Sequence, residues 1–430
     1  MKKQRKKMSS SVKMLIGMVL GLAAGVIFGD KVAIIKPFGT LFINLLKMCM
    51  VPIIFVSITL SVAQVTDFKQ FGRIGGKMFA LFMFTTTCGA IIGSTLVKVI
   101  KPGTKFLGMA SVGKITVTQS PSVSETLLAI VPTNPIKAMS NGDLLATIFF
   151  AIMLGVSLIL IGEKKEPVVN FLGSLFEAVM QMVKICLKYA PIGVFALMAD
   201  LAGTHGLKVL KPLAMFFTTE YLAMILQMFL VYGLLLYVFT KINIFKFLNR
   251  AKDVILISFT TASGSAAIPV ELEQAESHFG IPNKIAGFGL TIGATVNQDG
   301  AALNIPICVM FVAQFNGFNL TPTQLFTIVL MAIIMSCGAS GVPASATVFT
   351  LSILSSFGIP AEAFSLILAS YIIIDVGLTV INVVSDVVCV LIATKLEGQL
   401  NEEVWKPGYN LKKAIENRKN KVIEKQAVNI

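Results

Sequence analysis

The sequence predicts an all-α polytopic membrane protein, and three observations support this fold class. First, the 430 residues are 55% hydrophobic and only 13% charged, whereas a soluble domain carries about 25% charged residues. Second, apolar runs close to the roughly 20 residues of a membrane-spanning helix recur along the chain. Third, basic residues concentrate at both termini and between alternate runs. Lipid is therefore the predicted solvent, which argues against a cytosolic enzyme, a secreted disulfide-stabilised domain or a disordered protein.

Six apolar runs precede residue 252, and each approaches or exceeds the length that a spanning helix needs. They cover about 12–28, 38–65, 78–99, 144–161, 168–202 and 212–239. Lys47 and Pro52 interrupt the second run, and a polar stretch at 101–140 separates the third run from the fourth. We expect a helix over each run.

The distribution of basic residues predicts the topology. If the N-terminus is cytoplasmic, the connections after the second, fourth and sixth runs should be basic. They carry Lys69, Arg73 and Lys77, then Lys164 and Lys165, then Lys241, Lys246, Arg250 and Lys252. The tail after residue 405 is also basic. We expect a multi-pass protein of the cell (inner or plasma) membrane with both termini cytoplasmic.

The net charge of +14 is thus explained by membrane topology and contact with the lipid bilayer, and we expect no nucleic-acid partner. The six cysteines form no CxxC pair, and His205 and His278 lack the spacing of metal ligands. This pattern argues against a structural zinc site and a histidine-based catalytic triad. We expect no organic cofactor and no enzymatic activity.

Beyond residue 252, small and polar residues interrupt the apolar pattern three times. The interruptions are SFTTASGSAAIP at 258–269, GATVNQDG at 293–300 and SCGASGVPASA at 336–346. Non-helical backbone at membrane depth is tolerated only inside protein or around a water-filled cavity. The first and third interruptions are alike, and paired broken segments indicate a transporter binding site. The alternative is that they are loops between short helices.

Three intramembrane carboxylates have no basic partner in their own stretch of sequence. Asp299, Asp375 and Asp386 lie in apolar context, yet residues 285–394 contain no Lys, Arg or His. Buried carboxylates are costly and need partners, so bound cations (Na⁺, H⁺ or a substrate ammonium group) would neutralise them. The alternative is a set of protonated or hydrogen-bonded Asp residues that serve packing.

The spacing of polar residues near the C-terminus is helical. Asp375, Asn382 and Asp386 are seven and four residues apart, so they share one helix face, with Thr379 between them. Around Asp299, we expect Gly293 and Gly300 to let the chain unwind and aim carbonyl oxygens inward. Carboxylate, amide and carbonyl oxygens together are typical ligands of hard cations.

Motifs over nearly the whole chain resemble the dicarboxylate/amino acid:cation symporters, the family that includes the glutamate transporters. They are LLKMCMVPIIFVS, IVPTNPIKAMSNGDLLATIFFAIMLG, YAPIGVFALMA, GATVNQDG, GASGVPASA and DVGLTVINVVSD. The resemblance implies a homotrimer, each subunit having eight transmembrane helices and two re-entrant helical hairpins arranged as inverted repeats.

The same resemblance implies a division of the chain into two domains between cytoplasmic ends. A scaffold and trimerisation domain would comprise 12–66 and 140–203, and a moving transport domain would comprise 76–100 and 208–396. The hairpins would lie at about 253–281 and 322–358. Basic cytoplasmic segments would be 1–11 and 397–430.

The resemblance also implies three sodium sites. One would use the carbonyls of Gly293, Asn297 and Asn382 with the carboxylate of Asp386. A second would use the carbonyls of Thr295, Ser336, Cys337 and Ala339. A third would use Thr85, Thr86, the Asn297 side chain and Asp299.

For the substrate, the resemblance implies that Asp375 binds an amino group and Asn382 an α-carboxylate. The hairpin residues Ala262, Ser263, Ser265, Val342 and Ala346 would close over the ligand, with Leu378 and Thr379 beside it. Family members with acidic substrates carry Arg where this chain has Leu378, and Thr where it has Ala301. A Met of their ion-binding motif is Gln298 here.

The carboxylates without basic partners predict a sodium-coupled importer that works by alternating access, and the replacements at Leu378 and Ala301 predict that its substrate is a neutral amino acid. The alternative is a proton- or sodium-coupled symporter of glutamate, aspartate or a C4-dicarboxylate, with an Arg such as Arg73 or Arg250 reaching the site. A channel, a membrane enzyme and a receptor are weaker interpretations. The polar residues form no continuous path, and no nucleophile–base pair is visible.

Overall fold

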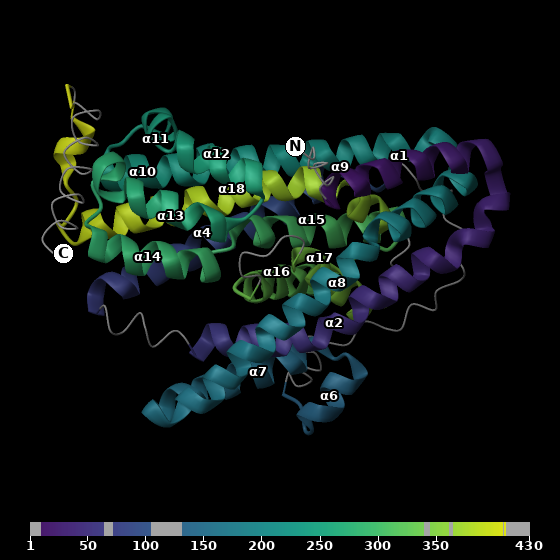
Figure 1. The fold of residues 1–430 in the computed structure, drawn as a ribbon, viewed down its shortest axis with the longest axis horizontal. Coiled ribbons are helices and arrows are strands. Elements are labelled where there is room, and N and C mark those ends of the chain that lie inside the picture. The colour runs from purple at the N-terminus through teal and green to yellow at the C-terminus, as the bar shows by residue number, and fades with distance from the viewer. Residues whose placement is uncertain are drawn as a thin grey trace, which may run out of the picture.

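The computed structural model describes residues 10–63, 72–104, 131–338, 345–360, 364–406 and 408–409. All regular secondary structure in these ranges is helical (Figure 1). The first half contains α1 (Ser10–Phe28), η1 (Gly29–Ile35), α2 (Lys36–Ala63), α4 (Gly72–Ile100), α6 (Pro135–Asn141), α7 (Leu144–Leu160), η3 (Gly162–Lys165) and α8 (Glu166–His205). The prediction of an all-α membrane protein is confirmed.

The second half consists of shorter and more frequently broken helices. They are η4 (Gly206–Val209), α9 (Leu210–Leu226), η5 (Gln227–Tyr232), α10 (Gly233–Thr240), α11 (Ile244–Arg250), α12 (Lys252–Thr261), α13 (Gly264–Gln274), η6 (Ala275–Phe279), α14 (Asn283–Val296), α15 (Asp299–Phe315), α16 (Pro322–Ser336), α17 (Ser345–Ser356), α18 (Phe364–Leu396) and η7 (Glu402–Trp405). The described residues of each apolar run are helical, and α2 continues through Pro52.

Six helical segments of the described ranges are long and apolar enough to cross a membrane. They are Ile16–Ala63, Gly72–Ile100, Gly162–Thr204, Leu210–Thr240, Asn283–Phe315 and Ile373–Leu396. The first contains both α1 and α2, which η1 joins, and the fifth contains both α14 and α15. The apolar helices α7, α16 and α17 are shorter. The protein is therefore a multi-pass membrane protein.

The helices form two packed groups. Helices α1, α2, α7 and α8 pack on one another, and Figure 1 shows α2, α7 and α8 running diagonally below the rest. In the other group, α4, α9 and α18 surround α15, and α12, α13 and α14 pack with α18. Contacts of α2 with α17, and of α1 and α8 with α18, join the groups.

Glycine spacing explains the close approach of α1 and α8. Gly17, Gly21 and Gly25 recur every four residues and face one side of α1. A Cβ atom at these positions would lie 2.6, 2.5 and 2.5 Å from backbone oxygens of α8. Small residues at such spacing let helix backbones pack closely within a membrane.

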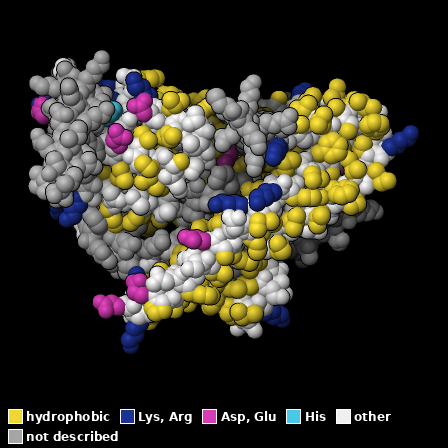
Figure 2. Space-filling model, viewed as in Figure 1, with side chains coloured by type: hydrophobic (Ala, Val, Ile, Leu, Met, Phe, Trp, Pro, Cys, Tyr) yellow, Lys and Arg dark blue, Asp and Glu magenta, His cyan; other side chains and the backbone are white. Residues whose placement is uncertain are grey.

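Apolar side chains cover much of the outer surface. Figure 2 shows them spread over the region of α1 and α8. Val19, Ile27, Phe171 and Ile192 are among the large apolar side chains that are more than half exposed. An apolar surface this extensive suits contact with lipid or with other membrane subunits.

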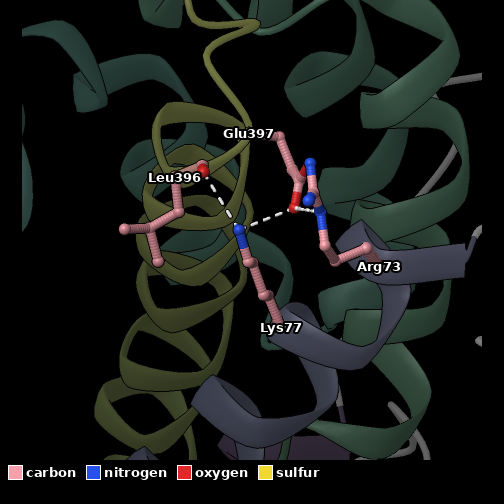
Figure 3. Close-up of polar contacts among 4 residues, drawn as sticks. All are labelled: Arg73, Lys77, Leu396 and Glu397. Carbon is pink, nitrogen blue, oxygen red and sulfur yellow. Dashed lines mark hydrogen bonds and ion pairs between the residues drawn. The ribbon is translucent and has the colours of Figure 1, made fainter.

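Charged side chains meet where α4 begins and α18 ends. Arg73 and Lys77 on α4 converge on the carboxylate of Glu397 (Figure 3), with nitrogen–oxygen distances of 2.8 and 2.6 Å. Lys77 also donates to the carbonyl of Leu396 at 3.0 Å. Hydrogen bonds from Arg73 and Lys77 lower the pKa of the Glu397 carboxyl group to about 2. These contacts tie the two helix ends together.

We expect Glu397→Gln to lower the thermal unfolding temperature in detergent at neutral pH, because it removes both ion pairs. A carboxyl group whose pKa is lowered by folding stabilises the protein above its unfolded-state pKa of about 4.3. This contribution is lost as pH falls toward the folded-state pKa of about 2. The difference between wild type and variant should therefore persist down to about pH 5 and shrink below it.

The matched control is Glu273→Gln, which changes an exposed acid of α13. Glu273 takes part in none of the ion pairs found in the described ranges. Equal unfolding temperatures for wild type and Glu397→Gln at neutral pH would contradict the structural role of Glu397.

Candidate functional site

The first interruption of the sequence is a turn between α12 and α13. Ala262 ends α12 in the left-handed region, with φ of 47°, and Ser263 is extended. This conformation is unfavourable for a residue with a Cβ atom, so tertiary packing holds it in place. Ala262 and Gly264 line a pocket, Ser263 is half-buried and Ser265 is exposed.

The third interruption of the sequence lies between α16 and α17. Helix α16 ends at Ser336, and Cys337 caps it. The Cys337 carbonyl accepts a hydrogen bond of 2.9 Å from Ser61 of α2. Ala346 lines the same pocket as Ala262, whereas Ala339 and Val342 lie outside the described residues. Residues beside the first and third interruptions thus contribute to one pocket.

The second interruption is short, and its glycines do not act as predicted. Helix α14 runs to Val296 and α15 starts at Asp299, so Gly293 and Gly300 are both helical. A Cβ atom at Gly293 would lie 2.7 Å from Asp386 Oδ1, and one at Gly300 would lie 2.6 Å from the Leu378 carbonyl. The chain leaves the helical conformation at Asn297 and Gln298, as expected, but not at the two glycines themselves. They instead let α18 pack closely against both helices.

Neutral donors surround the fully buried carboxylate of Asp299. Thr86 donates to Oδ1 at 2.7 Å, and Thr85 donates to the same oxygen at 3.2 Å. Ser385 and Tyr232 donate to Oδ2 at 2.7 and 2.8 Å. The structure therefore brings Thr85, Thr86 and Asp299 together, as the resemblance implied.

Gln227 and Tyr232 were not among the candidate residues, although both reach this cluster. Gln227 Nε2 lies 2.9 Å from the Thr85 carbonyl and 3.4 Å from Asp299 Oδ2. The two residues are the ends of η5, a π-helical turn. Two residues five positions apart on a regular α-helix point about 140° away from each other. The wider π-turn brings Gln227 and Tyr232 to the same side of the helix. Two polar residues in an apolar run were the available signal.

Asp386 forms the other half of the polar centre. Asn297 Nδ2 donates to Asp386 Oδ1 at 2.8 Å and to Ser385 Oγ at 3.0 Å. Asp386 is 1% exposed, and its Oδ2 atom has no hydrogen-bond partner. Among the described residues, no Lys, Arg or His forms an ion pair with Asp386 or Asp299. An unpartnered oxygen on a buried carboxylate suits a hard cation.

Gln298 connects the broken helix to α18. Asn382 Nδ2 donates to Gln298 Oε1 at 2.8 Å, and Gln298 Nε2 donates to the Ala294 carbonyl at 2.8 Å. Asn382 Oδ1 accepts from the Gly300 amide at 2.7 Å. The Asn382 side chain is therefore positioned by contacts on both sides.

In the second implied sodium site, the side chains of Thr295 and Ser336 do not bond to each other. The Thr295 hydroxyl donates to the Ile292 carbonyl and that of Ser336 to the Ile333 carbonyl, so both side chains bond within their own helices. Thr295 is exposed, whereas Ser336 is buried.

The pocket combines apolar residues with a few polar ones. Its described lining is Ala262, Gly264, Ala294, Gln298, Ala301, Ala346, Tyr371, Asp375, Leu378, Thr379, Asn382, Val383 and Asp386. No Lys, Arg or His belongs to this lining. Tyr371 was not predicted; its hydroxyl is hydrogen-bonded to Asp375. The pocket thus offers two carboxylates, two amides and two hydroxyls to a ligand.

The two arginines nearest in sequence are engaged elsewhere. Arg73 pairs with Glu397, and Arg250 lies 4.8 Å from the Trp405 ring centre while donating to the His278 carbonyl. In this conformation, neither arginine supplies a positive charge to the pocket.

Broken helices, a buried polar centre and an adjoining pocket define a membrane transporter of small solutes. The chain belongs to the sodium:dicarboxylate symporter family, whose model matches residues 11–396. It is not an enzyme. The names of several relatives describe transport coupled to protons or sodium.

Three relatives illustrate the family. The chain is 33% identical to a proton/sodium-glutamate symport protein of Geobacillus stearothermophilus, covering 93% of this chain and 97% of the relative. It is 31% identical to a C4-dicarboxylate transport protein of Bacillus subtilis (strain 168), with coverage of 91% and 94%. It is also 31% identical to a proton/glutamate-aspartate symporter of Escherichia coli (strain K12), with coverage of 92% and 95%.

We expect Tyr232→Phe to lower the free energy of unfolding by about 1.5–3 kcal/mol, because it removes a hydrogen bond to a carboxylate. Tyr237→Phe is the matched control, since its side chain is 60% exposed. Denaturation in detergent measures both variants. An equal loss of stability in the two would contradict the role of Tyr232 in holding Asp299.

Proposed function

We propose that this protein is a sodium-coupled symporter that imports a neutral amino acid by alternating access. The observation that carries the proposal is the pair of buried carboxylates, Asp299 and Asp386, whose contacts in the described structure are neutral donors. A bound cation would supply the missing positive charge. Without it, the charged form of the centre is costly to bury.

The proposed sodium ligands follow the geometry. Asp386 Oδ2 lacks a hydrogen-bond partner, and the carboxylate lies beside Gly293 and Asn297. Asp299 lies with Thr85 and Thr86. Oxygen atoms of these kinds are typical ligands of hard cations. The second implied site, from Thr295, Ser336, Cys337 and Ala339, stays a proposal without support from the contacts described above.

For the whole protein, we propose a homotrimer of subunits with eight spanning helices, two re-entrant hairpins and cytoplasmic termini. The number of eight is supported by the six long segments, because the 16–63 segment contains two helices, α1 and α2, and because α7 adds a further apolar helix. The α12–α13 and α16–α17 pairs would be the hairpins. The group around α1, α2, α7 and α8 would be the scaffold, and the group around α15 would move.

The pocket supports an amino-acid substrate. Asp375 would bind the amino group. Asn382 would bind the α-carboxylate with the second hydrogen of Nδ2, because the first goes to Gln298. Leu378 is 3% exposed and lines the pocket where a basic residue would be needed to hold a second carboxylate. A neutral side chain therefore fits this pocket best.

A second candidate is symport of glutamate, aspartate or a C4-dicarboxylate with sodium or protons. It is favoured by the names of the relatives, which are described as glutamate, glutamate-aspartate and C4-dicarboxylate transporters. It requires a basic group at the pocket, which the described lining lacks.

Uptake of labelled amino acids into proteoliposomes tests the coupling ion. We expect an inward sodium gradient to drive accumulation, and Asp386→Asn to abolish it by weakening sodium binding. Asp30→Asn, at an exposed position in η1, is the matched control and should transport normally. Accumulation that follows a pH gradient and ignores sodium would refute sodium coupling, and binding without flux would indicate a receptor.

Competition between neutral and acidic amino acids tests the substrate class. An unpaired buried carboxylate loses roughly 3–5 kcal/mol, so wild type should bind aspartate and glutamate about two to four powers of ten more weakly than a neutral amino acid. Leu378→Arg should shift preference toward acidic substrates, whereas Leu378→Met, an uncharged control, should not. A wild-type preference for aspartate or glutamate would refute the proposal.

A further inference from the structure

Glu220 is a buried acidic residue of α9 that the proposed ion and substrate sites do not use. Its side chain is 0% exposed. Its Oε1 atom accepts a hydrogen bond of 2.7 Å from Asn304 Nδ2 on α15, and Cys308 Sγ lies 3.9 Å from the same oxygen. The other oxygen, Oε2, has no hydrogen-bond partner. An ionised carboxylate held this way would be costly to bury.

Asn304, like Glu220, has a side-chain oxygen without a hydrogen-bond partner. Its Oδ1 atom is also buried without a hydrogen-bond donor. Two unsatisfied acceptors therefore belong to side chains that already share one hydrogen bond. A carboxylic acid and a primary amide can pair through two hydrogen bonds, with the amide N–H donating to one oxygen and the acid O–H donating to the amide oxygen. One proton on Glu220 would satisfy both acceptors.

We propose that Glu220 is a proton-binding site, in which the proton on Oε2 is shared with Asn304 Oδ1, and that this proton is carried with each transport cycle. The inference rests on the proposed symport function. It adds a second coupling ion at a place separate from the Asp299 and Asp386 centre. The proton is taken from external water as the O–H bond forms, and that bond breaks when the proton is released to cytoplasmic water.

Among the described residues, none of the titratable groups found to interact with Glu220 carries a positive charge. The titratable groups that interact with it are Tyr221 on α9, Cys308 on α15 and Tyr371 on α18. Helix α4, which also packs against α9, carries its Lys and Arg residues towards its two ends. None of the ion pairs in the described ranges involves Glu220. A proton is therefore the simplest way to neutralise this carboxylate.

Tyr371 connects Glu220 to the substrate pocket. Its side chain lines the pocket, is hydrogen-bonded to Asp375 and interacts electrostatically with Glu220. Glu220 thus lies close behind the pocket wall, on helices that pack together around α15. Protonation there would let the substrate-loaded group of helices cross the membrane without an additional buried charge.

Two measurements test the proposal, using the full-length protein. In proteoliposomes containing a pH-sensitive dye, substrate uptake should acidify the lumen for wild type and for Glu273→Gln, the exposed control. Glu220→Gln keeps the paired hydrogen bonds with Asn304 and cannot release a proton. This variant should retain sodium-dependent substrate exchange but should no longer acidify the lumen. Wild-type uptake should fall as the pH is raised, by up to about tenfold per pH unit for one coupled proton. Uptake by the variant should not show this fall.

Infrared spectroscopy provides a readout that needs neither substrate nor sodium. Wild type titrated between about pH 5 and about pH 9, a range in which buried carboxyl groups exchange protons, should show a carboxylic-acid carbonyl band that Glu220→Gln lacks. If that band is absent from wild type, or if Glu220→Gln keeps the wild-type pH profile and acidification, the proposal is wrong. Failure of sodium-driven uptake in wild type, with the band present, would instead refute the proposed function.

Discussion

The centre of this structure depends on buried carboxylates that form no ion pair with a basic side chain of the described residues. Asp299 is fully buried, and hydroxyl and amide donors from α4, η5 and α18 reach its two oxygens. Each donor helix must hold its position for these hydrogen bonds to exist. The carboxylate therefore orders the helices around it, while its charge is left for a cation to balance.

Small residues make this arrangement sterically possible. A Cβ atom at Gly93 of α4 would lie 2.3 Å from the Leu303 carbonyl of α15, and those at Gly293 and Gly300 would meet Asp386 and Leu378 of α18. Larger side chains would separate the helices and lengthen the hydrogen bonds to Asp299. Close packing and the polar centre thus depend on each other.

In the group of helices around α15, the described Lys and Arg residues lie toward the helix ends, and this distribution shapes the chemistry of the interior. Arg73 and Lys77 are held by Glu397, and Arg250 packs on Trp405. The pocket, lined by Leu378 and Ala301, contains acidic and neutral polar groups. Such a site attracts cations and ammonium groups, and it offers a second substrate carboxylate no partner.

The sequence by itself determined the class of protein and the positions of the long helices. It also showed that the stretch containing Asp299, Asp375 and Asp386 has no basic residue. These features could be predicted because hydropathy, periodicity and charge are local properties. The sequence also placed the polar face of α18. Only the tertiary structure decided how Gly293 and Gly300 are used, that a π-turn brings Gln227 and Tyr232 to Asp299, and that Glu220 meets Asn304. These contacts join residues far apart in sequence, so their partners depend on how the helices pack and on no pattern within any one helix.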